Sequence, residues 1–380
     1  MYWYGEEIRA YRREVRALLA EPPVRAELDA LHERPGTDPD VRALYRELGR
    51  RGLLAVNWPA RYGGEGRALL DAAVAGEELA RAGVPDTLYV NTVQIVGLFL
   101  LMAGSEQQKA THLPPLARGE RFASVLYTEP GSGSDLGSLS TTAVADEGGG
   151  WRLSGVKAFH MKSDLTDIGL CAARTGPAGG RYDGISLFIV DLHAPGVHRR
   201  TIGSIADEQF HRIEFDEVQL APGDLLGPEN GGWPLLTQAL AIERTGLDYS
   251  LKAENWLAAA GAALGPDADA AVCEEVGRYG AAVDGSRLLS WEVLEGLAAD
   301  RLDESLAAAA KFYCGELAAR IGRWAPTRVT GPLPERRAAV LEAAYREAPG
   351  LTVAAGTSEM MLEIVASLAL DGLAKEAAAW

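Results

Sequence analysis

The order of hydrophobic periodicities along the 380-residue chain is the feature that most constrains its fold. Apolar residues recur at helical spacing up to about residue 103, and short β-prone segments separated by glycine, proline and aspartate follow residue 125. Helical spacing with abundant alanine returns at Trp233. Helices, then strands, then helices indicate an α+β chain with a β module between two helical ones. We expect domains at residues 1–120, 121–228 and 229–380.

Local periodicity predicts the individual elements. Tyr11, Val15 and Leu19 share one face of a first helix, which must end by Pro22 because proline cannot continue a helix interior. The predicted helices span about residues 6–20, 40–52, 67–82 and 86–103, with connecting segments at 58–66 and 104–120. The predicted strands span residues 151–161, 168–174, 184–192 and 212–220.

The composition excludes several classes of function. A hydrophobic fraction of 47% and a charged fraction of 24% are ordinary for a globular protein. The net charge of −16 opposes sequence-independent binding of nucleic acid, because the chain would repel the phosphates. The most apolar run, around residues 95–102, is too short to span a bilayer. We therefore expect neither nucleic acid nor a membrane as a partner.

The cysteines indicate a reducing compartment. Cys171, Cys273 and Cys314 are far apart and odd in number, which favours free thiols in a cytoplasmic protein over a disulfide framework. No CxxC motif or Cys/His cluster indicates a metal site. The first twenty residues carry acids and bases throughout, unlike a secretory signal peptide. We expect a cytoplasmic protein without a bound metal.

The stretch VLYTEPGSGSD, residues 125–135, concentrates hydroxyls, glycines and carboxylates directly after a β-prone triplet. Glycine lets backbone N–H groups approach a ligand closely, and hydroxyls at such a turn can donate to ring heteroatoms or phosphate oxygens. This composition favours a loop that holds a cofactor. The alternative is a simple turn between two strands.

Glu243 is the candidate general base. It follows Ala239 by four positions and precedes Leu247 by four, which places it on the apolar stripe of a predicted helix. Burial raises the pKa of a carboxyl group toward the range useful for proton abstraction near neutrality. The neighbouring Arg244 can moderate that shift. The alternative is a structural Glu–Arg pair.

VLYTEPGSGSD closely resembles the TEPxxGSD flavin-loop signature of the acyl-CoA dehydrogenase family, whose members oxidise acyl thioesters with FAD. Residues 58–64, WPARYGG, are similar to that family's WPxxYGG loop, and residues 104–120 to its GxxxQKxxxLPxLxxGE segment. Residues 215–244 resemble its passage from the β domain into the first C-terminal helix. The resemblance implies a helical N-terminal domain, an antiparallel β-barrel-like middle domain and a C-terminal four-helix bundle.

The same resemblance implies roles for individual residues. Glu243 takes the place of the catalytic base, because the other position at which members carry this base holds Ala355. Ser134 and Arg244 are the implied substrate-binding residues. The implied FAD-binding residues are Leu126, Tyr127, Thr128, Ser134, Phe159, His160, Met161, Thr357 and Glu359. From the residues alone, Thr128 can simply end a strand, His160 can be a satisfied structural histidine, and Thr357 can cap the last helix.

Several motifs of the family are absent. Its WIT triplet over the flavin edge is replaced by Phe159, His160 and Met161, which removes the indole and the hydroxyl. Residues 263–277, ALGPDADAAVCEEVG, stand where the family has RxxFG, used by a neighbouring subunit to reach the FAD. Residues 323–332 stand near its glutamine-and-glycine FAD segment. The resemblance is strong over about residues 55–250 and clear again at 355–367. The missing motifs put in question both the family's usual homotetramer and the tightness of FAD binding.

The leading hypothesis is an FAD-dependent dehydrogenase that removes a C–H proton from an acyl thioester of CoA or of an acyl carrier protein and transfers a hydride to flavin N5. Such an enzyme could act in a specialised, polyketide-type biosynthetic pathway. One alternative is a non-catalytic or half-site subunit of a heteromeric acyl-CoA dehydrogenase, and another is a flavin-dependent monooxygenase on the same fold. The expected partners are the thioester, an electron acceptor such as an electron-transfer flavoprotein, and further subunits in a homo-oligomer (dimer or tetramer) or a heteromer.

Overall fold

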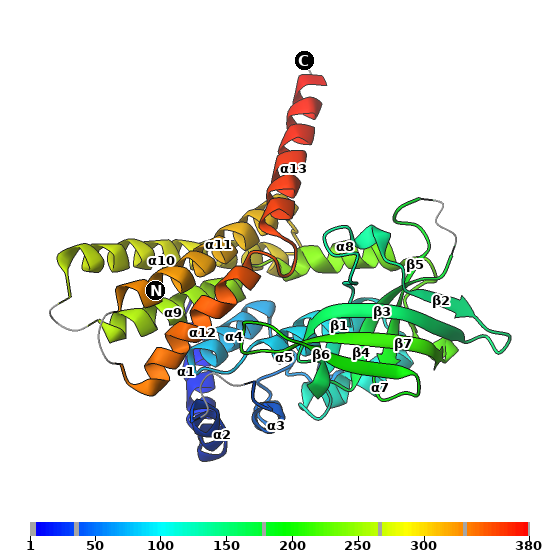
Figure 1. Ribbon diagram of the computed structural model, residues 1–380, viewed down its shortest axis with the longest axis horizontal. Coiled ribbons are helices and arrows are strands. Elements are labelled where there is room, and N and C mark those ends of the chain that lie inside the picture. Colours follow the sequence, from blue (N-terminus) through cyan, green and yellow to red (C-terminus); the bar gives the residue numbers. More distant parts are fainter. Residues whose placement is uncertain (1–4, 34–37, 177–179, 265–267, 330–332, 379–380) are drawn as a thin grey trace.

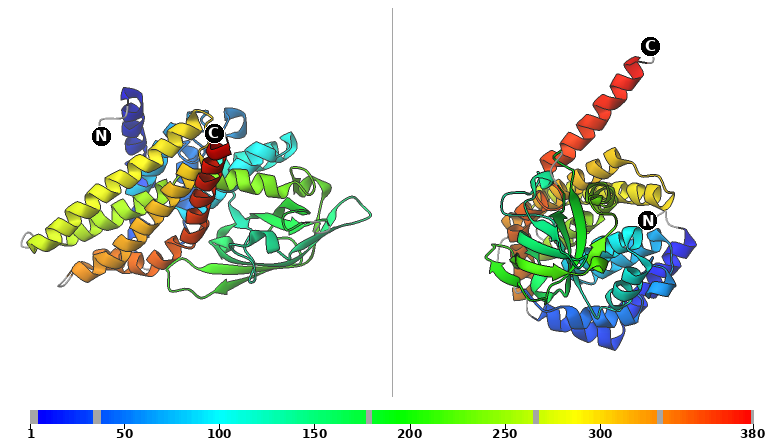
Figure 2. Two further views of the ribbon diagram at one scale, coloured as in Figure 1. Left: turned by 90° about the horizontal axis from the view of Figure 1, so that it is seen from above. Right: turned by 90° about the vertical axis from the view of Figure 1, so that its right-hand side faces the viewer.

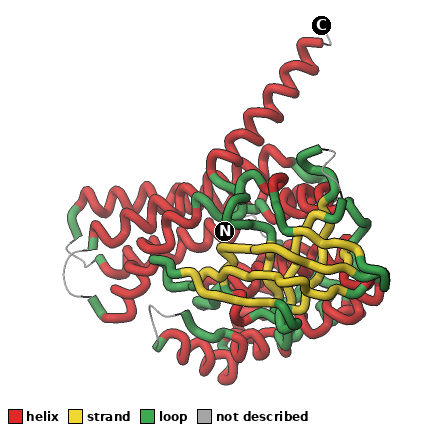
Figure 3. The backbone as a smooth tube through the Cα atoms, turned by 45° about the vertical axis from the view of Figure 1, so that its right-hand side comes forward, coloured by secondary structure: helices red, strands yellow, loops and turns green. Residues whose placement is uncertain are grey.

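The computed structural model of the protein describes residues 5–33, 38–176, 180–264, 268–329 and 333–378. Helices at both ends of the chain flank a single β-sheet (Figure 1), which confirms the predicted α+β class and the helix, strand, helix order. The strands gather on one side of the molecule and many of the helices lie on the other (Figure 3). Within the described ranges, no helix is long and apolar enough to cross a bilayer.

The N-terminal helices pack into one core with the sheet. They are α1 (Glu6–Leu19), α2 (Pro22–His32), α3 (Arg42–Arg50), α4 (Leu69–Arg81), α5 (Thr87–Tyr89), the π-helical η2 (Val90–Val96), α6 (Gly97–Ala103) and α7 (Glu106–Ala117). Periodicity did not predict α2, which starts at Pro22 because proline fits a first helical turn, where its missing N–H has no intrahelical partner. It also did not predict α7, which a capping box of Ser105 and Gln108 begins.

The eight strands form one sheet in the order β6-β7-β3-β2-β4-β5-β8, with β1 paired to β4. They are β1 (Ala123–Leu126), β2 (Thr142–Ala145), β3 (Trp151–Met161), β4 (Ile168–Arg174), β5 (Ile185–Asp191), β6 (Val197–Ile202), β7 (Phe210–Leu220) and β8 (Leu225–Leu226). Most pairs are antiparallel as predicted, but β1 runs parallel to β4, and β2 meets β4 at one parallel pair. Because parallel strands cannot be joined by a tight turn, the flavin-loop stretch does not form a hairpin between β1 and its partner β4.

Four of the C-terminal helices, α9 to α12, form the predicted bundle, and α8 and α13 lie outside it. They are α8 (Gly232–Glu243), α9 (Leu247–Ala263), α10 (Ala270–Ala298), α11 (Glu304–Arg328), α12 (Glu335–Leu351) and α13 (Ser358–Ala378). Helices α9 to α12 pack on one another around Tyr249, Trp256 and Leu317. Helix α13 starts against α11 and then extends away from the rest of the molecule (Figure 2), leaving Leu362 and Leu370 exposed.

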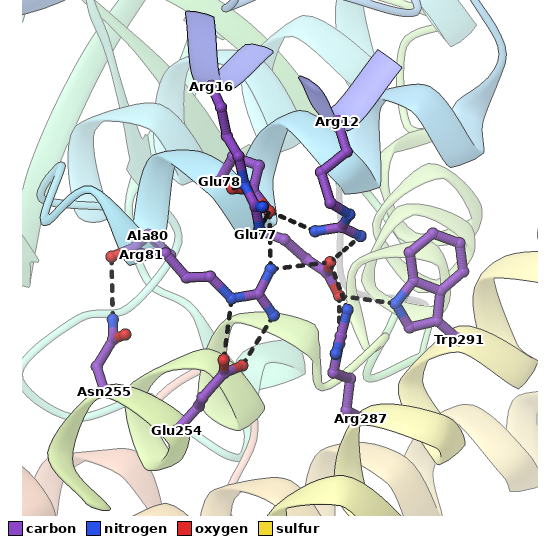
Figure 4. Close-up of polar contacts among 10 residues, drawn as sticks. All are labelled: Arg12, Arg16, Glu77, Glu78, Ala80, Arg81, Glu254, Asn255, Arg287 and Trp291. Carbon is purple, nitrogen blue, oxygen red and sulfur yellow. Dashed lines mark hydrogen bonds and ion pairs between the residues drawn. The ribbon is translucent and has the colours of Figure 1, made fainter. Parts of the chain in front are cut away.

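A cluster of ion pairs ties the N-terminal helices to the C-terminal bundle (Figure 4). Glu77 of α4 is fully buried, and it accepts hydrogen bonds from Arg287 at 2.6 Å and from the Trp291 indole at 2.9 Å, both on α10. Arg81 extends the cluster to Glu254 of α9 at 2.9 Å. Burial would raise the pKa of Glu77, but the hydrogen bonds from Arg287 and Trp291 outweigh it and lower the pKa to about 2. Because an unpaired buried charge is costly, this cluster fixes α4 against α9 and α10.

Candidate active site

The loop of residues 128–135 leaves the sheet beside β3. The Thr128 carbonyl oxygen accepts a hydrogen bond from the Ala158 backbone N–H at 2.9 Å and lies 3.2 Å from Nε2 of His160. The side chain of Leu126, two residues before Thr128, is fully buried inside the β domain. Strand β3 therefore sets where the loop starts, and Leu126 can face a ligand only through its backbone.

A buried ion pair anchors this loop. Oε1 of Glu129 lies 2.9 Å from Nζ of Lys157, and the same carboxylate accepts hydrogen bonds from the backbone N–H groups of Ser140 and Thr141. Burial opposes the charge on Glu129, but Lys157 and the hydrogen bonds outweigh it and lower the pKa of Glu129 to about 2. Sequence reasoning missed Lys157, although strand alternation from the buried Trp151 places it on the inner face.

The tip of the loop presents open backbone. Gly131 and Gly133 have no atoms within 4 Å of the place where a Cβ would stand, and Ser134 is exposed. The Ser132 hydroxyl donates to the Asp135 carbonyl at 2.6 Å, and Arg181 holds the Asp135 carboxylate at 2.9 Å. The base of the loop is thus rigidly held while its tip can take a ligand against the backbone.

The three residues in place of the WIT triplet are held very differently. Phe159 is 53% exposed and has a positive φ of 64°, a backbone conformation that is strained for a bulky residue and is often retained at ligand sites. His160 is buried, and burial together with the charge of Lys157 lowers its pKa to about 3, so its imidazole is neutral. Met161 is half-buried. The Phe159 ring is available to a ligand, whereas the His160 imidazole is engaged by the Thr128 carbonyl.

Glu243 is the last residue of α8, and this differs from the predicted continuous helix. The backbone leaves helical geometry at Arg244, and α9 begins only at Leu247 after Gly246 with a φ of 75°. The break frees the side chain of Glu243 from a regular helix face. Its Oε1 atom is buried and has no hydrogen-bond partner among the described residues. Burial raises the pKa of Glu243 to about 8, against the opposing charge of Arg244.

Tyr127 is within electrostatic reach of this carboxylate. Burial, and next the charge of Glu243, raise the pKa of Tyr127 well above its usual value. The Tyr127 hydroxyl is also buried without a hydrogen-bond partner among the described residues. Two unpartnered polar atoms therefore share one buried region, which is typical of a site that a ligand completes.

Arg244 connects the candidate base to the loop before α13. A Cβ added to Gly356 would stand 3.8 Å from a terminal nitrogen of Arg244, and Nζ of the buried Lys311 donates to the Gly356 carbonyl at 2.5 Å. Burial lowers the pKa of Lys311 to about 8. Ala355, in the same loop, is exposed and has a positive φ of 54°. Sequence reasoning missed Lys311, which sits within an alanine-rich helical run and carries no local signal.

The remaining predicted residues lie at the start of α13. The Thr357 hydroxyl oxygen accepts a hydrogen bond from the Met360 backbone N–H at 3.2 Å, so it caps this helix. Glu359, in the first turn, is exposed. No group of His, Cys, Asp and Glu able to hold a metal ion occurs among the residues the structure describes.

Three family models match the chain in succession. They describe the acyl-CoA dehydrogenase N-terminal domain over residues 5–120, its middle domain over 124–218 and its C-terminal domain over 230–370. FadE29, an acyl-CoA dehydrogenase of Mycobacterium tuberculosis, is 32% identical over 96% of both chains. The chain belongs to the acyl-CoA dehydrogenase family. The family match runs through residues 250–355, where the individual motifs are absent.

Solved structures agree with this family. The Tcur3481-Tcur3483 steroid ACAD has a TM-score of 0.84 at 28% identity, covering 97% of this chain and 98% of that one. The ChsE4-ChsE5 complex from Mycobacterium tuberculosis has a TM-score of 0.83 at 27% identity, covering 98% and 99%. Acyl-CoA dehydrogenases are FAD-dependent oxidoreductases that act on a CH–CH group, which confirms the predicted enzyme class and cofactor.

The residues present fit part of an FAD site. Open backbone at Gly131 and Gly133, the partly exposed Thr128 and the exposed Phe159 ring lie along one loop and the adjoining strand. Such a surface can hold a flavin edge by backbone N–H groups and ring contact. Residues 265–267 of the first divergent segment and residues 330–332 of the second lie outside the described ranges.

We predict that Lys157→Met lowers the stability of the protein by about 3 kcal/mol or more and reduces FAD retention, because Glu129 would be left buried and unpaired. Thermal unfolding and the flavin absorbance of the purified variant measure both effects. The folded-state pKa of Glu129 is lowered from 4.5 to about 2, so this stabilisation is present above about pH 4.5 and is lost as the pH falls toward 2.

The matched control is Lys109→Met, since Lys109 pairs at 3.6 Å with the exposed Glu106. An ion pair with an exposed partner contributes about 0–1 kcal/mol, so this variant should unfold near the wild-type temperature. Equal effects of the two substitutions would show that Lys157 does not anchor the loop.

Proposed function

We propose that this protein is an FAD-dependent dehydrogenase that desaturates an acyl thioester, with Glu243 as the catalytic base. The observation that supports this role is a buried carboxyl oxygen without a partner, at a helix break, with a pKa raised to about 8. A carboxylate with that pKa is basic enough to abstract a weakly acidic C–H proton near neutrality. Ala355 holds the alternative position of the base and has no acid–base chemistry.

The residues of the chain position the substrate for this step. Glu243 accepts the proton from the carbon next to the thioester carbonyl, in a region shielded from water that strengthens its basicity. Arg244 lies next to Glu243 in sequence, and its positive charge limits how far burial raises the pKa of Glu243. FAD, when bound, supplies the acceptor for the hydride that leaves the next carbon. Thr128, Ser134, Phe159 and Met161 are the residues proposed to contact FAD from the loop and β3, with Thr357 and Glu359 near its ribityl and phosphate groups.

Glu243→Gln should lower the turnover of an acyl thioester by about 10²- to 10⁴-fold, because the amide cannot accept the proton. Anaerobic bleaching of the bound flavin by a panel of acyl-CoA thioesters, without an external reductant, measures this step and separates a dehydrogenase from a monooxygenase. FAD content and thermal unfolding should stay near the wild-type values. Glu229→Gln, at an exposed position just before α8, is the matched control. Near-wild-type bleaching by Glu243→Gln would place the base elsewhere.

The quaternary state that we propose is a heteromer, in which a second acyl-CoA dehydrogenase chain completes the FAD site. Residues 263–277 contain no RxxFG motif, and the exposed leucines of α13 leave a projecting apolar helix free for another chain. Two of the structurally similar proteins are themselves described by paired chains, Tcur3481-Tcur3483 and ChsE4-ChsE5. The electron acceptor is proposed to be an electron-transfer flavoprotein, and the compartment the cytoplasm, in line with three free cysteines.

The chain purified alone should therefore hold FAD only in part, at less than one FAD per chain without added FAD, and the flavin that it does hold serves the bleaching assays above. Flavin absorbance against protein concentration, together with mass photometry, measures both the ratio and the assembly. A homotetramer with one FAD in each chain would contradict the heteromer and leave the proposed chemistry of Glu243 untouched.

A further inference from the structure

The side chain of Tyr127 faces the helices and not the β domain. Leu126 lies in the core between the strands, and the next residue turns the opposite way, as expected for extended chain. Tyr127 packs instead among the N-terminal helices, where its ring meets Phe99 of α6 edge-on, with the ring centroids 6.2 Å apart. Helix α8, which ends at Glu243, packs against α6 as well. Tyr127 and the helix that carries the candidate base therefore meet the same helix, α6.

The hydroxyl of Tyr127 has no function in the fold itself. The residue is only 8% exposed, yet its hydroxyl has no hydrogen-bond partner among the described residues. A buried polar group left in this state destabilises a protein, so such groups are normally satisfied. Tyr45 shows the usual arrangement nearby: its hydroxyl donates to the Pro85 carbonyl at 2.6 Å and accepts from the Tyr89 backbone N–H at 3.1 Å.

The position of this hydroxyl indicates which part of a substrate it meets. A thioester remains joined to a large hydrophilic carrier, so the carrier end must point to solvent and the acyl chain must point inward. Tyr127 is on the inward side, against Phe99, and not at the exposed loop tip of Gly131 to Ser134. A purely hydrocarbon chain would leave the Tyr127 donor unsatisfied.

We propose that Tyr127 donates a hydrogen bond to an oxygen atom carried by the acyl chain beyond the reacting carbons, so that the substrates are oxygenated acyl thioesters. The inference rests on the proposed dehydrogenase function and narrows its substrate class. Sites built to hydrogen-bond a substrate oxygen reject the analogue without it strongly, because the protein group is then left buried and unpaired.

The experiment compares eight-carbon acyl-CoA thioesters that are unsubstituted or carry one keto oxygen on the fourth, fifth or sixth carbon. Anaerobic flavin bleaching gives kcat/KM for each with the wild-type holoenzyme and with Tyr127→Phe. In the wild type, at least one keto thioester should exceed the unsubstituted chain by about ten- to a hundredfold. In Tyr127→Phe this ratio should fall to near one.

Two further measurements separate the possible roles of the hydroxyl. The dissociation constants of the same thioesters with holoenzyme carrying Glu243→Gln, with and without Tyr127→Phe, should show the same loss of preference in the absence of turnover. Tyr45→Phe is the control, because it removes a satisfied hydroxyl: it should lower the unfolding temperature and leave the preference intact. Tyr127→Phe should not lower the unfolding temperature.

The outcomes distinguish this inference from the proposed function. If wild-type flavin is bleached by the unsubstituted chain as well as by every keto thioester, the inference is wrong while the dehydrogenase stands. If Tyr127→Phe slows all thioesters equally or reduces FAD content, the hydroxyl serves the base or the cofactor, and the inference is again overturned. If no thioester bleaches the flavin, the proposed function fails and the inference falls with it.

Discussion

The chemistry of this protein depends on one carboxyl oxygen, Oε1 of Glu243, which is buried and has no hydrogen-bond partner among the described residues. Desolvation disfavours the charged form of an acid, and a shift of one pKa unit corresponds to about 1.4 kcal/mol. The folded protein must supply that free energy through packing elsewhere. The break between α8 and α9 presents the carboxyl group to the buried region, and Arg244 limits the shift so that ionisation near neutrality stays within reach.

Three glutamates, two of them buried and the third with a buried carboxyl oxygen, show how the surroundings decide the chemistry of one residue type. Glu77 and Glu129 each meet cationic partners and backbone or indole donors, and the pKa of each falls to about 2. Glu243 has an oxygen without a partner, and its pKa rises to about 8. The first two fix helices and the flavin-loop stretch in place, which suits a structural role, whereas the third remains able to exchange a proton.

The fold was largely predictable because periodicity and turn residues agree along most of the chain. Strands β3 and β4 coincide with the predicted ranges, since alternating or β-branched runs are bounded by clear turn residues. Helix α2 was missed because Pro22 was interpreted only as a terminator, and the parallel pairing of β1 with β4 was missed because pairing partners are distant in sequence.

The candidate site was predictable only in part. The threonine and serines of the loop and Glu243 lie in sequence motifs that resemble those of the family. Their roles were therefore predicted from that resemblance. The sequence alone could not assign a role to Lys157 or Lys311. Each contacts a loop that is distant from it in sequence: Lys157 contacts Glu129, and Lys311 contacts the Gly356 carbonyl. The helix break after Glu243 was also hidden, since Thr245 and Gly246 were absorbed into an otherwise helical pattern. Contacts between distant segments, rather than local propensity, complete this site.

We expect the Glu243 carboxyl group to be protonated at pH 6, to be ionised in part at neutral pH, where it can act as a base, and to lose its proton with a midpoint near pH 8. Infrared difference spectroscopy of the wild type against Glu243→Gln tests it directly, because a protonated carboxyl group has a C=O stretch that a carboxylate lacks. The expected result is a C=O band at pH 6 that is present only in the wild type and disappears with a midpoint near pH 8. A Glu243 side chain already ionised at pH 6 would contradict it.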